Sequence, residues 1–444
     1  MSILRSSTLR LLVCRSRFPS FPSASVAPER TVQESKISAA SSRTVIGPAH
    51  VIPVLASFCL GLAAFGSGMS QRVMDPLLPE LSRSFGISLS MASYTVTVFS
   101  VSYGIALLFY GPLGDLFGKY RTITIGCFLS ALAALLCALA PDFESLLFGR
   151  LLAGVLTAGL IPLTMAWLGD MIPLQQRRTA LARFLIGQMI GVSGGVLAGG
   201  IAADYLGWRA PFFLLAALFL AAGLFLRRYP ALYAPSAARE NLHGSAIVTK
   251  MLKEYVAVSR NRWARLVVLA VFLEAGSFYG AFAFVATHLH TQHGIPLATA
   301  GSTLALFGLG GVVFAWQSSR LARVHASTIV LWAGGIAGTA LIGIAVSPAW
   351  WWALPGCFLS GVGFYMFHNA LQLEASQMEP TRRGTAVALF ACLHAAGQAA
   401  GVWTVGLAVE VIGTSASIAL SASLLFCVAI GFNLLRARLQ PMSL

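Results

Sequence analysis

Two charged side chains lie inside segments of the sequence that are otherwise apolar. Glu274 is the only carboxylate well inside the segment 265–287, and Arg150 lies near the start of the segment 144–169. A charge in the middle of a membrane helix costs roughly 2.5–3.5 kcal/mol on insertion scales, so such residues usually mark ion or proton pathways. Glu274 is therefore the first candidate for a group that gains and loses a proton, with a fixed hydrogen bond or ion pair as the alternative. Arg150 is expected to face an aqueous cavity or a partner, unless its side chain reaches the outer surface.

Polar residues at helical spacing occur in two later apolar segments. His368 and Gln372 are four residues apart and share one helix face, with Asn369 beside them. His394 and Gln398 repeat this spacing in the next segment. Because polar side chains in membrane helices often hydrogen-bond between helices, each set is suited either to binding a substrate or to joining two helices.

A third group of histidines, His288, His290 and His293, forms an H-x-H-x-x-H pattern. We place it in an external loop without Cys or acidic ligands, so we predict no metal site there. The cysteines are isolated and are expected to be small packing residues. No P-loop, Ser/His/Asp set or H-E-x-x-H pattern is present in the sequence. We therefore expect neither an enzyme nor an ATP-driven pump, and no cofactor.

The composition is typical of a membrane protein. Of the 444 residues 57% are hydrophobic and 10% are charged, against roughly 25% charged residues in soluble domains. The net charge of +15 comes from bases spread through the connections between apolar segments, where they fix the orientation in a membrane. We therefore predict an all-α integral membrane protein that sits in the lipid bilayer and does not bind nucleic acid.

The apolar segments predict twelve transmembrane helices in two pseudo-symmetric six-helix halves. They lie near 51–73, 91–110, 121–140, 144–169, 182–203, 211–227, 265–287, 297–318, 327–347, 350–374, 384–409 and 413–435. The predicted domains are a disordered tail at 1–50, an N-terminal bundle at 51–228, a cytoplasmic loop at 229–262, a C-terminal bundle at 263–438 and a tail at 439–444. A transit peptide or an over-extended start is the alternative for the first of these.

Basic residues are concentrated in alternate connections between the predicted helices. Arg72, Arg83 and Arg209 are the only bases that fall on one side. The other connections hold all the remaining bases of this region, so they are predicted to be cytoplasmic together with both termini.

The two halves also resemble each other in sequence. Thr179, Ala180, Ala182 and Phe184 recur at a constant spacing as Thr385, Ala386, Ala388 and Phe390, after an M-x-P pattern present in both halves. Internal duplication is typical of transporters built from two related halves, in which the substrate site lies near the midplane between them.

The polar, glycine-rich stretch at 111–121 is predicted to be a cytoplasmic turn between the second and third helices. It resembles the signature found at this place in the major facilitator superfamily, through Gly111, Leu113, Asp115, Gly118 and Lys119. It departs from the family pattern at Leu116 and Tyr120, where members usually carry a base. Arg150 with Gly154 is similar to the R-x-x-x-G pattern of helix 4 in the same family.

The sequence G-V-S-G-G-V-L-A-G-G at 191–200 resembles the helix 5 antiporter motif of that family, with Val196 in place of the usual proline. The glycines assigned to this motif are Gly191, Gly195, Gly199 and Gly200. Their spacing predicts a small-residue face for close helix packing, and in the antiporter interpretation this face also seals the two halves. The G-W-R at 207–209 and the H-N-x-x-Q at 368–372 are similar to bacterial efflux permeases.

The resemblance implies a gate at 111–121, to which Arg121 also belongs. Asp115 is expected to face the N-terminal end of helix 11 near Thr385. Lys119 is expected to pair with Asp170, and both contacts should exist only while the cytoplasmic side is closed. The alternative is a plain loop of solvated charges.

The resemblance further implies a cavity among helices 1, 4, 7 and 10. It favours His368, Asn369 and Gln372 as substrate contacts and gives Arg150 a part in proton coupling, while His394 and Gln398 are expected to join helices. We predict a monomeric secondary transporter of the bacterial inner membrane that exports a small organic compound by proton antiport through alternating access. The alternatives are a proton-coupled uptake symporter for an organic anion or sugar, and a membrane scaffold or receptor that transports nothing.

Overall fold

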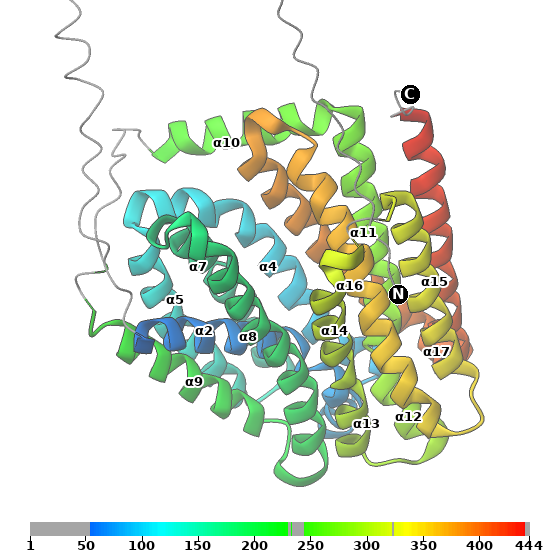
Figure 1. Cartoon of the computed structure of the whole chain (residues 1–444). Coiled ribbons are helices and arrows are strands. Elements are labelled where there is room, and N and C mark those ends of the chain that lie inside the picture. Colours follow the sequence, from blue (N-terminus) through cyan, green and yellow to red (C-terminus); the bar gives the residue numbers. More distant parts are fainter. Residues whose placement is uncertain (1–53, 230–231, 233–243, 322–323, 440–444) are drawn as a thin grey trace, which may run out of the picture. The chain divides into compact units, whose positions relative to one another are not determined.

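The computed structural model describes residues 54–229, 232, 244–321 and 324–439, and the predicted tail at 1–50 lies outside them. The described residues are almost entirely helical (Figure 1). The N-terminal half, residues 54–229, contains α2 (Val54–Arg72), η1 (Asp75–Leu77), α3 (Leu78–Phe85), α4 (Leu89–Phe117), α5 (Lys119–Ala138), α6 (Phe143–Thr157), α7 (Leu160–Met171), α8 (Leu174–Ile201), η2 (Ala202–Leu206) and α9 (Ala210–Leu226). After α10 (Gly244–Arg260), the C-terminal half contains α11 (Arg262–Phe282), α12 (Val285–His293), α13 (Leu297–Leu304), α14 (Leu306–Leu321), α15 (Ala326–Val346), η4 (Trp350–Trp352), α16 (Ala353–Gln377), η5 (Pro380–Arg382) and α17 (Arg383–Leu439).

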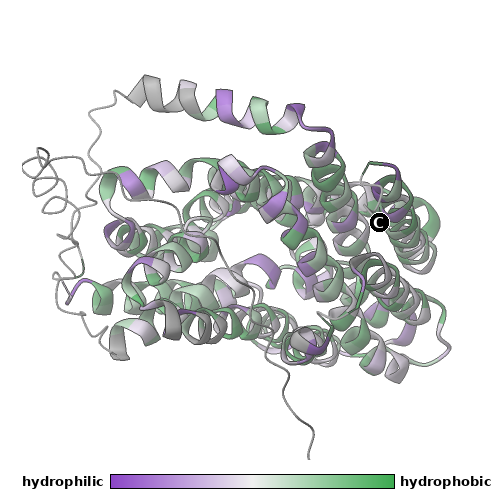
Figure 2. Ribbon diagram, turned by 45° about the horizontal axis from the view of Figure 1, so that its top comes forward, coloured by the Kyte–Doolittle hydropathy of each residue, from purple (hydrophilic) through white to green (hydrophobic). Residues whose placement is uncertain are grey.

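Helix occupies each of the predicted apolar segments within the described residues. In the described part of the chain, eight helical segments are long and apolar enough to cross a membrane, and α9, with 17 residues, is a shorter apolar helix. The last two predicted helices form the single element α17, which changes direction at Gly413, where φ is 78°. Hydrophobic residues run along most of the helices, whereas α10 carries several hydrophilic ones (Figure 2). The all-α membrane fold is confirmed, while the count of twelve crossings remains a prediction.

The glycines of α8 pack closely against α2. A Cβ atom added at Gly191, Gly195 or Gly199 would lie 2.2–2.6 Å from the backbone oxygens of Phe65 and Met69 in α2 and of Val73 directly after it, closer than real side chains approach. The predicted close packing is therefore confirmed. Its partner is a helix of the same half, so these three glycines do not seal the two halves. Only Gly200 does so, because its added Cβ would lie 2.4 Å from the Leu297 oxygen of α13.

Among the described residues, the two halves meet mainly where α4 contacts α17 and where α8 contacts α13 and α14. An added Cβ on Gly104 of α4 would lie 2.9 Å from Ala395 of α17, and the Ser193 hydroxyl of α8 donates a hydrogen bond of 3.0 Å to the Ala305 oxygen. Small residues thus allow the halves to approach closely at both of these contacts.

The predicted turn at 111–121 is mostly helix. Helix α4 continues to Phe117, only Gly118 has a non-helical conformation with φ 87°, and α5 begins at Lys119. Pro112 lies inside α4 and has no N–H to donate to the Leu108 oxygen one turn earlier. The Tyr255 hydroxyl of α10 donates to this oxygen instead, at 3.0 Å, so the proline is accommodated without ending the helix.

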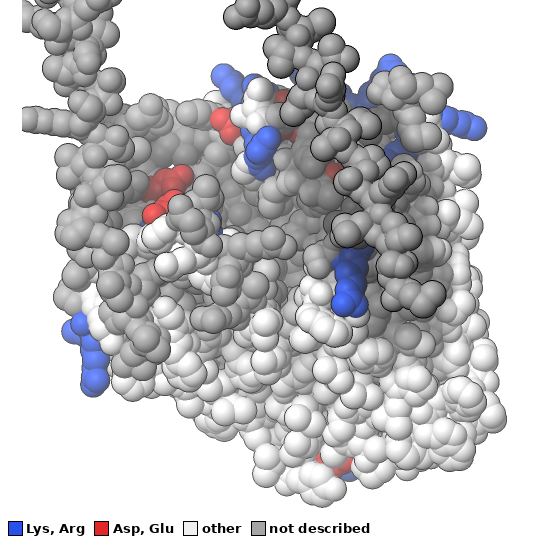
Figure 3. Space-filling model, viewed as in Figure 1, with Lys and Arg blue, Asp and Glu red and all other residues white. Residues whose placement is uncertain are grey.

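The predicted central loop contains a helix, α10, which contacts both halves. Beside Tyr255, Glu254 accepts a hydrogen bond of 2.9 Å from the Thr385 hydroxyl of α17. Burial raises the pKa of Tyr255 to about 12, so the phenol remains a neutral donor near pH 7. Most Lys and Arg side chains visible in Figure 3 lie towards the end where α10 and the C-terminal end of α17 are found, and few charges are visible towards α12 and α13.

Candidate functional site

Glu274 lies between two histidines in the C-terminal half. Helix α11 supplies Glu274, α16 supplies His368, and the part of α17 before Gly413 supplies His394. Oε2 of Glu274 lies 3.5 Å from Nδ1 of His368 and 3.8 Å from Nδ1 of His394. The centroids of the two imidazole rings are 4.5 Å apart. We call these three residues the carboxylate–histidine cluster.

No good hydrogen bond joins the members of this cluster. The distances exceed the 2.7–3.2 Å that N–H···O bonds usually span, and both oxygens of Glu274 and both Nδ1 atoms lack a hydrogen-bond partner among the described residues. A buried carboxylate without donors is unfavourable as an anion, and an imidazole can either donate or accept a hydrogen. The cluster therefore places a buried carboxyl group beside two imidazoles, which are side chains of the types that take part in proton transfer.

The three side chains differ in their access to solvent. Glu274 is 0% exposed, whereas the side chains of His368 and His394 are 22% and 20% exposed. His368 stacks on Phe364, with ring centroids 5.6 Å apart, and His394 meets the ring of Tyr279 edge-on at 5.7 Å. Aromatic packing thus holds the imidazoles beside the carboxylate, and only the imidazoles reach the accessible surface. His394, which was predicted to join helices, belongs to the site.

The ligand atoms of this cluster all lie within 4.8 Å of one another. This spacing and the combination of imidazole and carboxylate are also open to a divalent metal ion. The expectation that the protein needs no metal or cofactor therefore stays a prediction.

Arg150 is buried at a separate place in the N-terminal half. Its Nε donates a hydrogen bond of 3.1 Å to the Thr95 oxygen of α4, and one NH2 group donates one of 3.1 Å to the Ser70 oxygen of α2. The guanidinium also lies 4.1 Å from the centroid of the Phe99 ring. The side chain is 0% exposed, so it does not reach the outer surface. In this conformation its contacts do not include Glu274 or His368, with which it was predicted to share a cavity.

A buried ionic network that the sequence analysis did not predict joins the two halves. Arg72, at the end of α2, lies 3.4 Å from Asp75 and donates a hydrogen bond of 3.0 Å to Gln398 of α17. Gln398 in turn donates one of 2.8 Å to the Ser100 hydroxyl of α4. Arg72 also lies 3.6 Å from the centroid of the Tyr279 ring, and that ring contacts His394.

Arg72 had been assigned to an external connection, but its side chain is only 2% exposed. The sequence signal for this buried ion pair was the presence of two opposite charges, Arg72 and Asp75, three residues apart at the end of an apolar segment. The prediction that Gln398 joins helices is confirmed by its two partners.

The predicted gate is only partly assembled. Lys119 and Asp170 pair at 2.6 Å, as predicted, but both belong to the N-terminal half. Asp115 and Arg121 are exposed, and Thr385 of α17 bonds to Glu254 of α10, not to Asp115. The Lys119–Asp170 contact is therefore confirmed and lies within one half, whereas the contact of Asp115 with the start of α17, and the dependence of both contacts on a closed cytoplasmic side, remain predictions.

Other predicted polar residues lie apart from the cluster. Asn369 and Gln372 of α16 are exposed, and their part in binding a substrate remains a prediction. His288 and His290 lie on helix α12 and not in a loop; their Nδ1 atoms are 2.9 Å from the Thr414 hydroxyl and from the Ile295 oxygen. These histidines stabilise the local structure.

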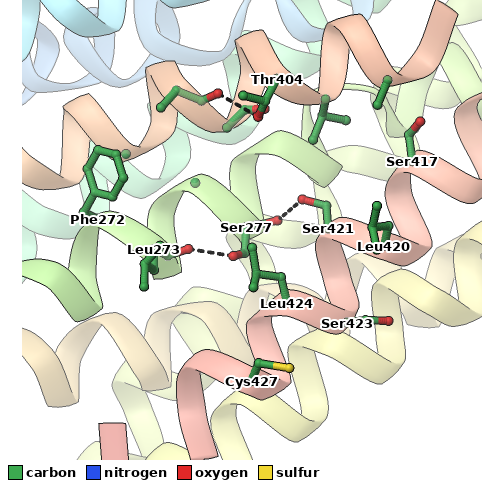
Figure 4. A pocket seen from close by; sticks show the side chains of 16 residues that line it. Phe272, Leu273, Ser277, Thr404, Ser417, Leu420, Ser421, Ser423, Leu424 and Cys427 are labelled. Carbon is green, nitrogen blue, oxygen red and sulfur yellow. Dashed lines mark hydrogen bonds between the residues drawn. The ribbon is translucent and has the colours of Figure 1, made fainter. Parts of the chain in front are cut away.

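An apolar pocket of about 630 Å³ lies between α11 and the two parts of α17 (Figure 4). Its hydroxyl groups are already used, because Ser277 donates to the Leu273 oxygen and Ser421 donates to the Ser277 oxygen. The neighbouring Leu420 is exposed. This pocket offers apolar surface and contains no member of the carboxylate–histidine cluster.

Comparisons with known proteins agree with this architecture. The family model "Major Facilitator Superfamily" matches residues 60–402. The chain is 22% identical to the MFS-type transporter YwfA of Bacillus subtilis over 68% of its own length and 72% of that protein. It is 32% identical to Citrate exporter 1 of Aspergillus niger, over only 35% of this chain and 30% of that protein.

Among solved structures, the nucleoside transporter NupG is similar with a TM-score of 0.70 and 14% identity, over 85% of this chain and 98% of NupG. At that identity the likeness concerns the fold alone. Because the family model covers most of the chain and the helices follow the same fold, the chain belongs to the major facilitator superfamily of membrane transporters.

Proposed function

We propose that this transporter exports a small organic compound in exchange for protons, with Glu274 as the proton site. The observation that carries the proposal is the carboxylate–histidine cluster, in which a fully buried carboxylate lacks hydrogen bonds among the described residues and faces two imidazoles. A carboxylate in this position that must lose its proton before cargo binds, and regain it on release, produces antiport directly.

Two further observations support export. A third of the chain is similar to a citrate exporter, and the glycines at 191–200 resemble the antiporter motif of helix 5, with Gly191 and Gly195 packed closely on α2 and Gly200 on α13. We infer that the protein is a monomer in a bacterial inner membrane, uses the proton gradient without a cofactor, and has both termini in the cytoplasm. The gathering of bases near α10 and the C-terminal end of α17 supports that orientation.

The test is proton movement in everted membrane vesicles that contain the protein. A panel of small organic compounds, with citrate included, is added to vesicles whose lumen is acidic, and a fluorescent pH indicator records the loss of this gradient as protons leave in exchange for the compound. The parent protein is expected to dissipate the gradient when its substrate is added. In Glu274→Gln this flux should fall at least about a hundredfold, the smallest loss typical of removing a proton-transferring side chain.

Glu80→Gln is the matched control, because Glu80 is a carboxylate that pairs with Arg83 on α3, far along the chain from the cluster. It should leave the flux unchanged. Unchanged coupling in Glu274→Gln would remove Glu274 from the mechanism. Substrate-driven acidification of intact cells, without loss of the gradient in everted vesicles, would replace export by uptake.

A further inference from the structure

Two carboxylates cap helices that belong to the opposite half of the protein. Oδ2 of Asp204, in η2, accepts a hydrogen bond of 2.7 Å from the Ala298 N–H of α13. Oε1 of Glu410, in α17, accepts one of 3.0 Å from the Ser90 N–H of α4. Ala298 and Ser90 are each the second residue of their helix. The first N–H groups of a helix have no partner within it, and they carry a partial positive charge that favours a carboxylate.

The two contacts are copies of one arrangement. The same spacing along the chain separates Asp204 from Glu410 and Thr179 from Thr385, so the two carboxylates are equivalent positions of the internal repeat. Asp204 reaches from the N-terminal half to the C-terminal half, and Glu410 reaches in the opposite direction. Both lie at the end predicted to face outside, where α12 and α13 are found (Figure 1).

Below each cap the two halves are in close contact. An added Cβ on Gly200 of α8 would lie 2.4 Å from the Leu297 oxygen of α13, and one on Gly406 of α17 would lie 2.8 Å from the Ser93 hydroxyl of α4. Separating either pair of helices at this end must therefore break the cap above it. Both carboxylate side chains are exposed, so water can replace the lost hydrogen bond, and the contact is weak enough to open and close repeatedly.

We propose that Asp204 and Glu410 are positioning residues that form a two-point latch on the outer end, and that the protein opens outwards only when both caps are released. The proposal rests on the alternating-access part of the proposed function. It requires neither proton coupling nor a particular cargo, so a failed test of Glu274 would leave it standing. Its own test needs no substrate and no gradient.

The test measures how often the outer end opens. Val196 of α8 and Ser93 of α4 are 2% and 0% exposed, and each lies at one of the two contacts between halves. Val196→Cys and Ser93→Cys are placed separately in the full chain with its native cysteines replaced by serine, and the protein is reconstituted in nanodiscs. The rate of labelling by a hydrophilic maleimide then reports opening at each helix pair.

Each latch variant is read at the opposite pair. Asp204→Asn is measured with Ser93→Cys, and Glu410→Gln is measured with Val196→Cys, because loosening confined to one cap would not reach the other pair. The amide of each variant keeps an oxygen that can accept the hydrogen bond, so each variant removes the negative charge at the helix N-terminus. Such a charge contributes roughly 0.3–1 kcal/mol, which corresponds to about a twofold to fivefold change in an equilibrium. We expect labelling to rise about threefold in each variant and about ninefold in the double variant, since the two caps share no partner.

Asp142→Asn is the matched control. Asp142 accepts a hydrogen bond of 2.8 Å from the Ser145 N–H and so caps its own helix, α6. This hydrogen bond holds the pKa of Asp142 below its usual value, so the control loses a negative charge as the latch variants do. Because carboxylate and helix belong to the same half, labelling should stay within about twofold of the parent.

Latch variants that label no faster than Asp142→Asn at the opposite pair, while eluting as folded monodisperse protein, would overturn the proposal. If a latch variant does not fold, salt provides the second measurement. Raising the ionic strength to about 1 M screens exposed charges and should speed labelling of the parent protein. Equal labelling of the parent at low and high salt would count against the latch.

Discussion

Arg150 and Glu274 are both fully buried charged residues in membrane helices, yet the protein holds them differently. Arg150 donates hydrogen bonds of 3.1 Å to two backbone oxygens and lies over the Phe99 ring. Glu274 makes no hydrogen bond among the described residues, and two imidazole nitrogens lie 3.5 and 3.8 Å from its Oε2. The first residue is fixed in place by hydrogen bonds to the backbone, and the second faces two imidazoles without a hydrogen bond.

This difference follows from the chemistry of the two groups. A guanidinium keeps its charge in proteins, so backbone carbonyls and an aromatic face can serve it permanently. A carboxylate needs donors, and an imidazole is a donor or an acceptor depending on where its proton lies. The N-terminal half therefore contains a buried charge that stabilises the packing of α2, α4 and α6. Under the proposed function, the C-terminal half contains one whose protonation state changes during transport.

The largest expected effect is the loss of stability when the charge of Arg150, which is held by hydrogen bonds, is removed. Arg150→Met deletes two hydrogen bonds made by a charged donor, each worth roughly 1.5–3 kcal/mol, so we expect a loss of about 3 kcal/mol of stability. Glu274→Gln removes a carboxylate that has no hydrogen bond to lose, so its stability should equal or exceed that of the parent. The apparent Tm of the purified proteins in one detergent checks both.

Arg83→Met is the control for that comparison, because Arg83 is an exposed guanidinium that pairs only with Glu80 on its own helix. It should leave the Tm almost unchanged. A fall of the Tm in Glu274→Gln as large as in Arg150→Met would show that both charges are structural. The contrast between the two halves would then disappear.

An intermediate effect should come from the imidazoles that face Glu274. His368→Gln and His394→Gln keep an amide able to hydrogen-bond but cannot take a proton. We expect each to lower substrate-driven proton flux about tenfold, which corresponds to about 1.4 kcal/mol on the barrier. The double variant should lose about a hundredfold, the product of two tenfold losses, and so approach Glu274→Gln.

His290→Gln is the control for losing a histidine of the same half outside the cluster. The Nδ1 atom of His290 lies 2.9 Å from the Ile295 oxygen. The flux of this variant should equal that of the parent. Full flux in both His368→Gln and His394→Gln would mean that Glu274 exchanges its proton without them.

The fold could be predicted further from the sequence than the site. Apolar segments of membrane length and basic residues in alternate connections predicted helices that the structure contains, because a membrane leaves few other ways to satisfy the backbone. The turn at 111–121 was predicted too long, since Gly and Pro suggested a break that the Tyr255 hydroxyl repairs from a distant helix. A contact so remote in the chain leaves no local pattern.

Within the site, Glu274 and His368 were predicted from their types and positions, whereas His394 and Arg72 were assigned to other roles. Helical spacing shows which residues share a face, but it does not show which helix that face meets. Arg72 was placed outside because it ends an apolar segment. Its burial depends on Gln398 and Tyr279, which lie in the other half of the chain.

The smallest effect should come from the polar residues of α16 that do not touch the cluster. Asn369 is exposed beside His368, and if its amide binds the cargo, Asn369→Ala removes one hydrogen bond of roughly 0.5–1.5 kcal/mol. We expect the KM for substrate to rise about threefold to tenfold, with the maximal rate and the proton coupling unchanged. Ser376→Ala is the control on the same helix, because its hydroxyl is used by the Leu373 oxygen at 2.7 Å. An unchanged KM in Asn369→Ala would restrict the site of the C-terminal half to the carboxylate–histidine cluster, whereas a loss of coupling would extend the proton pathway along α16.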